Sequence, residues 1–444
     1  MWRSHRICLM LLVGTILAET GTKPIVPFAD YHQHLFSPAK AAALYDPPLP
    51  AVPLPADLTS LIKARERAQN DESQLATLYA HDAMMLNTQD TDAPSWIRGN
   101  QAVAKEAAIY FDEPYRITPV SYQIDGSSAF IAGYYTAIKD KSPRHLAHLF
   151  LSLKKEDGSW RIVTELPGFP GPPHRDPSTA DQLIRQLDDA GIQKAVVLSV
   201  AYQWGSDEGC PACTPEQEYA KVKAENDYIA AQVGRYPNRL VGFCSFNPLK
   251  TYALEELNRC SKLPGMRGLK LHFGNSRVDI RNPEHLEKVR AVFRAANQLK
   301  IPMVVHLWTD PAYEKEGAQH AQIFLDRLLP DAPDVTIQIA HLAGGGRATP
   351  SALAVFANAI AKSDPRTKHL YFDLATITEG ESAEGLKEDA RFIRQIGVNR
   401  ILYGTDTSPP NPPARVSWAS IRSLVPLTDE EFRSIADNIA PYLQ

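Results

Sequence analysis

The sequence predicts an α/β fold, a (β/α)8 barrel that is interrupted near its start by an α+β insert. Helical and strand-like segments alternate strictly from residue 179 onward, and an apolar run at residues 25–34 has no local partner. Two stretches, residues 37–56 and 166–178, are too rich in proline for helix interiors or central strands, and they bracket a module with a different pattern. Repeated βα units are typical of a closed parallel barrel of the TIM type.

The barrel elements follow from the hydrophobic pattern after the second proline-rich stretch. Strands are expected at residues 194–200, 240–246, 268–273, 302–308, 335–342, 370–375 and 401–406. Helices are expected at residues 179–190, 215–235, 252–262, 283–299, 319–329, 350–361 and 384–396, with a further helical region behind them. The run at residues 25–34 supplies the first strand of the barrel. The insert therefore separates this strand from its helix.

The bracketed module has the pattern of an α+β domain. Helices are expected at residues 58–70 and 74–79, and short alternating runs include residues 128–136, 145–153 and 160–164. The polar residues 154–159 are a hairpin signal between the last two runs. The predicted organisation is a signal peptide at 1–22, the first barrel segment at 23–50, the insert at 57–166 and the remainder of the barrel at 167–444.

The first residues have the pattern of a signal peptide. A basic start is followed by an apolar run at residues 7–18 and then by polar residues. This run is shorter than the ~18–20 residues that span a bilayer, so a retained membrane anchor is the weaker alternative. No later segment is apolar enough to span. The sequence predicts an exported protein, periplasmic or secreted.

Composition points to small-molecule chemistry. The chain is 44% hydrophobic and 22% charged, with a formal net charge of −4, which is typical of a globular protein. It has no Lys/Arg block of the kind that binds phosphate backbones, so nucleic acid is not expected as a partner.

Four cysteines remain outside the predicted signal peptide, at positions 210, 213, 244 and 260. In an oxidising compartment, Cys210-Pro-Ala-Cys213 is expected to form a small structural disulfide. A redox-active pair and a zinc knuckle are alternatives, but the first needs its own βαβ context and the second needs two more ligands nearby.

Five polar residues are predicted at the carboxyl ends of barrel strands, where active sites of such barrels form. They are His32, His34, His306, His341 and Asp406. His32 and His34 share one face of the first strand because successive side chains alternate. Each residue could be a satisfied polar group by itself, but five at one rim indicate a site for zinc or a similar divalent ion.

On these residues the sequence resembles the amidohydrolase superfamily, in its branch of amidohydrolase-related and aminocarboxymuconate-semialdehyde-decarboxylase-like enzymes. The resemblance covers strand one and residues 179–444. The resemblance implies that His32, His34, His306 and Asp406 bind a metal ion and that His341 and Asp406 are catalytic. It is carried by Ala29-Asp-Tyr-His-Gln-His34, Gly268-Leu-Lys-Leu-His272, His306, His341 and Tyr403-Gly-Thr-Asp406.

The resemblance implies a metal-dependent hydrolase, in which metal-activated water attacks an amide, ester or lactone carbonyl. One divalent ion is expected, with zinc as the first candidate. A metal-dependent non-oxidative decarboxylase (carboxy-lyase) on the same barrel is the alternative, and a non-catalytic binding protein is the second alternative. The ligand set does not choose between hydrolysis and decarboxylation. The predicted export favours the hydrolase, because family decarboxylases mostly act on intermediates of internal pathways.

Three further residues are candidates for substrate binding or for a second metal ion: Lys270, His272 and Arg347. Lys270 and His272 alternate toward the same side of strand four, and a carboxylated lysine on that strand bridges two metals in some superfamily members. Arg347 follows a glycine-rich loop and could hold an anionic group, or it could be a solvated charge. Asp373 is expected to be a buried hydrogen-bonding residue.

The insert resembles the nuclear transport factor 2-like (SnoaL-like) cone-shaped fold. Its motifs are loose: Asp57-Leu-Thr-Ser-Leu61, Leu78-Tyr-Ala-His-Asp-Ala83, Ile97-Arg-Gly-Asn-Gln101 and Gly158-Ser-Trp-Arg-Ile162. The resemblance implies homodimer formation through the insert or a lid over the barrel mouth. A second catalytic site using His81, Asp82, His145 or His148 is the weaker alternative.

Overall fold

The computed structural model describes residues 24–43, 49–87, 95–109, 114–138, 145–167, 177–207, 209–308, 311–345, 348–379, 381–409 and 414–444. The chain divides into two compact units, Met1–Ser37 with Pro177–Gln444, and Pro38–Asp176. The predicted signal peptide at residues 1–22 lies outside the described residues. Within the described ranges, no helix combines the length and the apolar character needed to cross a membrane.

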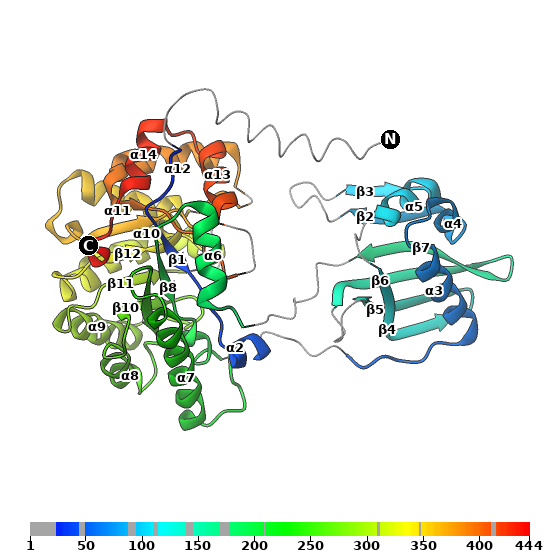
Figure 1. The fold of residues 1–444 in the computed structure, drawn as a ribbon, viewed down its shortest axis with the longest axis horizontal. Coiled ribbons are helices and arrows are strands. Elements are labelled where there is room, and N and C mark those ends of the chain that lie inside the picture. Colours follow the sequence, from blue (N-terminus) through cyan, green and yellow to red (C-terminus); the bar gives the residue numbers. More distant parts are fainter. Residues whose placement is uncertain are drawn as a thin grey trace. The chain divides into compact units, whose positions relative to one another are not determined.

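The first unit contains a barrel of eight parallel strands (Figure 1). Neighbours in the sheet follow the order β1-β8-β9-β10-β11-β12-β13-β14, and each pair is parallel. The fold class predicted from the sequence is confirmed. The strands are β1 (Ala29–Gln33), β8 (Lys194–Leu198), β9 (Leu240–Ser245), β10 (Met266–His272), β11 (Met303–His306), β12 (Ile337–Ile339), β13 (Leu370–Asp373) and β14 (Ile401–Leu402).

Backbone hydrogen bonds between β1 and the segment after β14 close the barrel. Tyr31 N donates to Tyr403 O at 2.9 Å, and Asp406 N donates to His32 O at 2.7 Å. This approach requires glycine at position 404, because a Cβ atom there would lie 2.7 Å from Cβ of His32. The closure brings Asp406 beside the histidines of the first strand.

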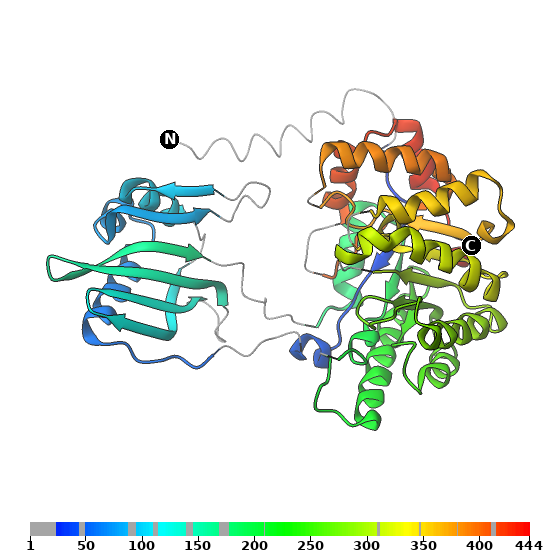
Figure 2. The same ribbon diagram turned by 180° about the vertical axis from the view of Figure 1, so that it is seen from behind.

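Helices surround the strands of the barrel (Figures 1 and 2). Several begin at a side-chain cap, and Thr179, Thr214 and Thr428 each form a reciprocal capping box. The helices are α6 (Ala180–Ala190), α7 (Pro215–Gly234), α8 (Ala253–Cys260), α9 (Pro283–Gln298), α10 (Pro311–Ile323), α11 (Pro350–Ala361), α12 (Ala383–Ile396), α13 (Ala414–Leu424) and α14 (Asp429–Asp437). Short helical turns are η1 (Ala201–Gln203), η2 (Phe324–Leu328), η3 (Leu329–Asp331), η4 (Ala340–Ala343), η5 (Pro365–Thr367), η6 (Val398–Arg400) and η7 (Pro441–Leu443).

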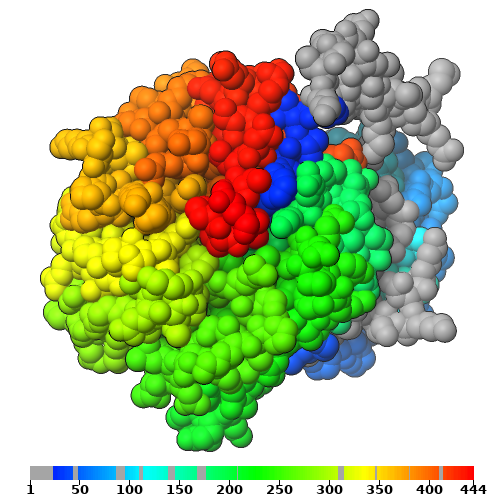
Figure 3. Space-filling model, turned by 60° about the vertical axis from the view of Figure 1, so that its left-hand side comes forward, coloured from blue at the N-terminus to red at the C-terminus, as the bar shows by residue number. Residues whose placement is uncertain are grey.

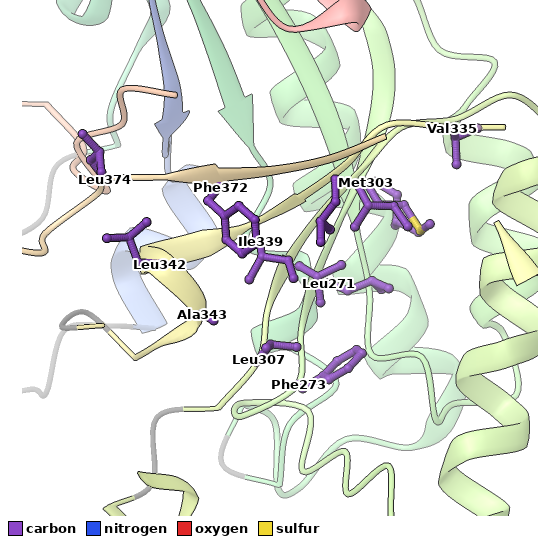
Figure 4. Packing of buried hydrophobic residues seen from close by; sticks show 14 of the residues in the cluster. Leu271, Phe273, Met303, Leu307, Val335, Ile339, Leu342, Ala343, Phe372 and Leu374 are labelled. Atoms are coloured by element: carbon purple, nitrogen blue, oxygen red, sulfur yellow. The ribbon is translucent and has the colours of Figure 1, made fainter. Parts of the chain in front are cut away.

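The main core of this unit lies between the strands and the helices. Leu271, Met303, Ile339 and Phe372 come from four consecutive strands and gather on one side of the sheet (Figure 4). Residues at the alternate positions of the strands point to the other side of the sheet. They include Val196, Phe243 and Val304 and form a second cluster inside the barrel.

The C-terminal residues contribute to this inner cluster. Ala440 and Leu443 belong to it, and the Tyr442 hydroxyl donates a hydrogen bond to Oε1 of Gln338. Tyr31, near the start of β1, donates through its hydroxyl to Asn438 O at 3.0 Å. In the view of Figure 3 the C-terminal residues, in red, lie at the centre of the barrel face. The C-terminal segment therefore covers the floor of the barrel, and access to the interior is from the opposite, carboxyl ends of the strands.

The second unit is an α+β domain. Its six-stranded sheet has the order β3-β2-β7-β6-β5-β4, in which β2 and β7 are parallel and the other neighbours are antiparallel. The elements are α2 (Pro38–Ala43), α3 (Ala56–Ala68), α4 (Glu72–Ala76), β2 (Tyr79–Asn87), β3 (Ser95–Arg98), α5 (Asn100–Ile109), β4 (Tyr115–Asp125), β5 (Ser128–Ala137), β6 (His145–Glu156) and β7 (Ser159–Pro167). The helix expected at residues 74–79 was wrong in its bounds, because Asp71 caps it earlier and Tyr79 begins β2.

One face of the insert sheet packs against α3, α4 and α5. Leu58, Leu75 and Val103 from the helices share a core with Ile131 and Leu151 from the sheet. The insert is therefore a helix-covered sheet with its own core, which confirms the predicted α+β module.

A buried ion pair lies inside this insert. Arg65 NH2 is 2.9 Å from Oε1 of Glu165, and both residues are 1% exposed. The hydroxyls of Tyr79 and Tyr135 donate to the same carboxylate, and Arg65 NH1 donates to the Tyr115 hydroxyl at 2.7 Å. Burial opposes ionisation of Glu165, but Arg65 outweighs it and holds the pKa of Glu165 below its ordinary value.

Two disulfides lie in the barrel unit. Cys210 and Cys213 are bonded, as the sequence predicts. A second disulfide joins Cys244 in β9 to Cys260 in α8, and both of its residues are buried. This pairing was not predicted, because a separation of 16 residues between a strand and a helix carries no local signal in the sequence.

Candidate metal centre

The five polar residues expected at strand ends meet at the mouth of the barrel, but three of them, His34, His341 and Asp406, lie beyond their strands. His32 is in β1 and His306 ends β11. The expectation that His341 and Asp406 end strands was wrong: β12 stops at Ile339, and β14 stops at Leu402. Both residues have left-handed backbones, with φ of 53° and 54°, and a strand cannot continue through that conformation.

His32, His34 and Asp406 form a compact group. Oδ1 of Asp406 is 2.9 Å from Nε2 of His34 and 3.3 Å from Nε2 of His32. The three ligand atoms lie within 4.8 Å of one another, an arrangement that could hold a metal ion. This group joins the first strand of the barrel to the segment that follows the last one.

The Nδ1 atoms of His32 and His34 are held by hydrogen bonds to other protein groups. Nδ1 of His34 donates to Leu198 O at 2.8 Å, and Nδ1 of His32 donates to Oδ2 of Asp373 at 3.1 Å. A neutral imidazole that donates through Nδ1 carries its lone pair on Nε2. Nε2 is therefore the atom through which each ring would bind a metal ion, and a carbonyl or carboxylate behind the ring is the usual support of a metal-binding histidine.

His306 and His341 complete the ring of imidazoles. The ring centroid of His341 lies 4.9 Å from that of His32 and 4.6 Å from that of His306. Nε2 of each residue is buried and has no hydrogen-bond partner among the described residues. Buried polar atoms in native proteins are normally paired, so these two nitrogens indicate a missing partner such as a metal ion or a substrate group.

The charges in the cluster fit a divalent cation. Burial and the nearby Lys270 lower the pKa of His32 to about 4, and burial lowers the pKa of His306 well below its ordinary value. Burial opposes ionisation of Asp406, but His32, the hydrogen bond from His34 and His341 hold its pKa well below the usual range. Neutral imidazoles and one carboxylate are the ligands that zinc and related ions take.

Lys270 and His272 lie in the same cluster. Nζ of Lys270 is 3.1 Å from Nε2 of His32, and burial lowers the pKa of Lys270 to about 8. The ring of His272 stacks on that of His306, with centroids 3.9 Å apart. Arg347 lies outside the described residues. Asp373 is buried and hydrogen-bonded, as the sequence predicts.

Tyr202 in η1 is a further residue of the site that was not predicted from the sequence. Its ring centroid is 4.8 Å from that of His272, and the side chain is buried. The signal was present, because Tyr202 lies two residues after the expected strand at residues 194–200 and so belongs to a loop at the barrel mouth.

A closed βα barrel with a histidine and aspartate cluster at its mouth defines the class of metal-dependent barrel enzymes. The family model described as Amidohydrolase matches residues 213–438, just over half of the chain. This protein therefore belongs to the amidohydrolase family.

Solved structures are similar to parts of the chain. One is 5-carboxyvanillate decarboxylase from Sphingomonas paucimobilis, with 16% identity, covering 57% of this chain and 79% of that chain, at a TM-score of 0.42. Another is 2,6-dihydroxybenzoate decarboxylase from Rhizobium, with 16% identity, covering 59% and 87%, at a TM-score of 0.43. A shorter chain named Rd1NTF2_05 has 16% identity and covers 25% of this chain and 96% of its own length, at a TM-score of 0.22.

Proposed function

We propose that this protein is a metal-dependent hydrolase that uses activated water to cleave an amide, ester or lactone. The carrying observation is the convergence of Nε2 of His32, Nε2 of His34 and Oδ1 of Asp406, with the unpartnered Nε2 of His306 nearby. His32, His34, His306 and Asp406 would hold one divalent ion, with zinc as the first candidate.

A divalent ion bound there supplies Lewis-acid chemistry: it lowers the pKa of a bound water and polarises a carbonyl. Asp406 fits the role of proton acceptor, since its side chain is ionised and 29% exposed toward the mouth. It would take a proton from the attacking water and return it to the leaving atom.

His341 fits the role of a hydrogen-bond acceptor in this site. Its Nδ1 donates to Ala375 O at 2.8 Å, so Nε2 is the ring nitrogen that can accept a hydrogen bond. That Nε2 atom is 3.6 Å from Oδ2 of Asp406. Together the two groups can hold a water or a substrate hydroxyl between them and move its proton.

Reaction in labelled water tests the proposed chemistry. A panel of amides, esters and lactones is incubated with zinc-loaded protein in H2-18O. We expect 18O in the product carboxylate, because water adds to the carbonyl carbon. Release of carbon dioxide from a carboxylated substrate, with a solvent proton on the product carbon, would identify the decarboxylase instead.

Export is also part of the proposal. Two disulfides among the described residues are consistent with folding in an oxidising compartment, where such bonds persist. Fractionation of cells that express the full chain, with thiol labelling of the recovered protein, tests this. We expect processed protein outside the cytoplasm without free thiols. Unprocessed cytoplasmic protein with five reactive thiols would contradict it.

We further propose that the insert carries a homodimer contact. The sheet face opposite the insert core presents aromatic side chains: the rings of Phe130 and Phe150 stack at 5.6 Å, and Phe150 is 38% exposed. The rings of Tyr134 and His148 lie beside them, 5.4 Å apart. Light scattering on wild type and Phe150→Glu tests this: we expect a dimer that the substitution dissociates, and a monomeric wild type would contradict it.

A further inference from the structure

His272 is held in place by both its ring contacts and a backbone hydrogen bond. Its ring stacks on His306, which belongs to the neighbouring strand β11, with an interplanar angle of 17°. Tyr202 contacts it from the other side of β10, because η1 follows β8. The backbone N–H of Asn275 donates to Nδ1 at 3.1 Å. The side chain therefore has one orientation, which its neighbours determine.

The hydrogen bond from Asn275 fixes the protonation of this ring. A nitrogen that accepts a backbone N–H must carry a lone pair, so Nδ1 of His272 has no proton, and the ring's proton is on Nε2. His32, His34 and His341 have the opposite arrangement, because each donates through Nδ1. In those three rings Nε2 faces a carboxylate oxygen of Asp406, whereas His272 presents an N–H through Nε2 and is unsuited to bind a metal through that atom.

The Nε2–H group of His272 lies at the barrel mouth. His272 and His306 are paired in register across β10 and β11, and paired residues of parallel strands point to the same side of a sheet. No described protein group accepts a hydrogen bond from Nε2 of His272. The residue is 7% exposed, so it is buried but retains some access. It is a donor without an acceptor beside the proposed metal ligand His306.

We propose that His272 is a catalytic residue whose Nε2–H donates to the carbonyl oxygen of the substrate. This assignment rests on the hydrolysis proposed above. As the water oxygen bonds to the carbonyl carbon, the π electron pair moves onto the carbonyl oxygen, and the N–H stabilises the charge that develops there. Collapse of that adduct breaks the bond to the leaving atom, which receives the proton taken from water by Asp406. A donor held in advance is suited to this role, because it needs no reorganisation during the reaction.

Two substitutions separate hydrogen-bond donation by Nε2 of His272 from the packing of its ring. His272→Gln keeps an N–H near the position of Nε2, and His272→Phe keeps a ring but has no donor. We expect both variants to retain the wild-type metal content. In His272→Phe we expect kcat to fall by about 10²–10³-fold, as for loss of one oxyanion donor, with a small change in KM, and we expect His272→Gln to recover at least about tenfold of this loss. Loss of the metal in both variants, or an unchanged kcat in His272→Phe, would overturn the proposal.

His285 offers a matched control. Its Nδ1 also accepts a backbone N–H, from Asp279 at 3.2 Å, but it lies on α9 rather than at a strand end. His285→Gln should therefore leave kcat and metal content at wild-type values.

Nitrogen-15 NMR of histidine-labelled protein tests the assignment without activity. The signals of His272 are identified by their absence in His272→Gln. We expect a protonated Nε2 and an unprotonated Nδ1 in both metal-free and zinc-loaded protein, as for His285. Loss of the Nε2 proton on zinc addition would make His272 a ligand and overturn the proposal. If no substrate of the panel is hydrolysed, the proposed function fails, and the NMR and metal measurements still decide whether His272 is a donor.

Discussion

Asp373 accepts a hydrogen bond from Nδ1 of His32 at 3.1 Å and one from the backbone N of His341 at 2.9 Å. One buried carboxylate on β13 therefore orients two residues of the proposed site. Burial opposes its ionisation, but His32 and His341 hold the pKa of Asp373 below its ordinary value. The carboxylate remains charged at neutral pH and can support His32 as a metal ligand.

Replacement of Asp373 by Asn should weaken metal binding. The amide cannot provide two anionic acceptors, so His32 loses the support that fixes its tautomer, and we expect zinc affinity to fall by about 10–100-fold. Competition with a chelator measures this. Asp389→Asn is a matched control, because Asp389 is also buried but lies on α12 and has an unpartnered Oδ2. Equal affinities for Asp373→Asn and wild type would exclude the supporting role.

Replacement of Asp406 by Asn should affect turnover more than substrate binding. The change removes the carboxylate charge beside His32 and His34 and also the proton acceptor, so we expect kcat to fall by at least about 10²-fold. Steady-state kinetics at saturating zinc separates this loss from weaker metal binding. A variant with near wild-type kcat would show that another residue accepts the proton.

Replacement of Lys270 by Met should preserve a single bound ion. The proposed set of four ligands does not include Lys270, whose Nζ lies 3.1 Å from Nε2 of His32. We expect about one equivalent of zinc in both wild type and Lys270→Met by elemental analysis. Two ions per chain in wild type, both lost in the variant, would instead indicate a lysine-bridged pair.

Excision of the insert near Pro53 and Pro170 should leave the barrel folded. Each unit has its own hydrophobic core, and the proline-rich stretches at both ends favour few contacts across the junctions. A shortened chain that joins these positions is expected to fold cooperatively and to bind zinc. Failure to fold, or loss of zinc from a folded product, would make the insert a structural part of the barrel.

Acid should destabilise the insert through the Arg65–Glu165 pair. The pKa of Glu165 is lowered from 4.5, so the pair's contribution to stability is present above that pH and is lost as the pH falls through the folded-state value. Arg65→Met leaves the carboxylate buried without its partner and should cost about 3–5 kcal/mol of insert stability at pH 7. Urea unfolding at pH 7 and pH 3 measures both effects. In the variant the stabilising effect of neutral pH should disappear, and a variant as stable as wild type would contradict this account.

Sequence patterns were sufficient for the barrel and for the residues that meet at its mouth, because strand alternation and strand ends are local features. They did not predict that His341 and Asp406 lie beyond their strands in left-handed backbone conformations. Both residues follow short strands and adopt left-handed backbones that depend on barrel closure. The tautomer of His272 could not be predicted from the sequence either, because the backbone N–H of Asn275 in the following turn determines it.

The Cys244–Cys260 bond and the tyrosine network around Glu165 depend on tertiary contacts between distant elements. Residues such as these become partners only after the chain has folded, and their spacing in the sequence carries no period. Arg347 lies outside the described residues, so its predicted role stays a prediction.

The pairing of Tyr31 with Tyr403 and of His32 with Asp406 has a consequence for biosynthesis. The strand that carries His32 and His34 leaves the ribosome before the insert, but its partner beyond β14 is made only after the insert and the other barrel strands. The insert can acquire its own core during this interval, whereas the proposed metal ligands remain apart. Newly made chains should therefore be unable to retain zinc until the segment after β14 has left the ribosome and paired with β1.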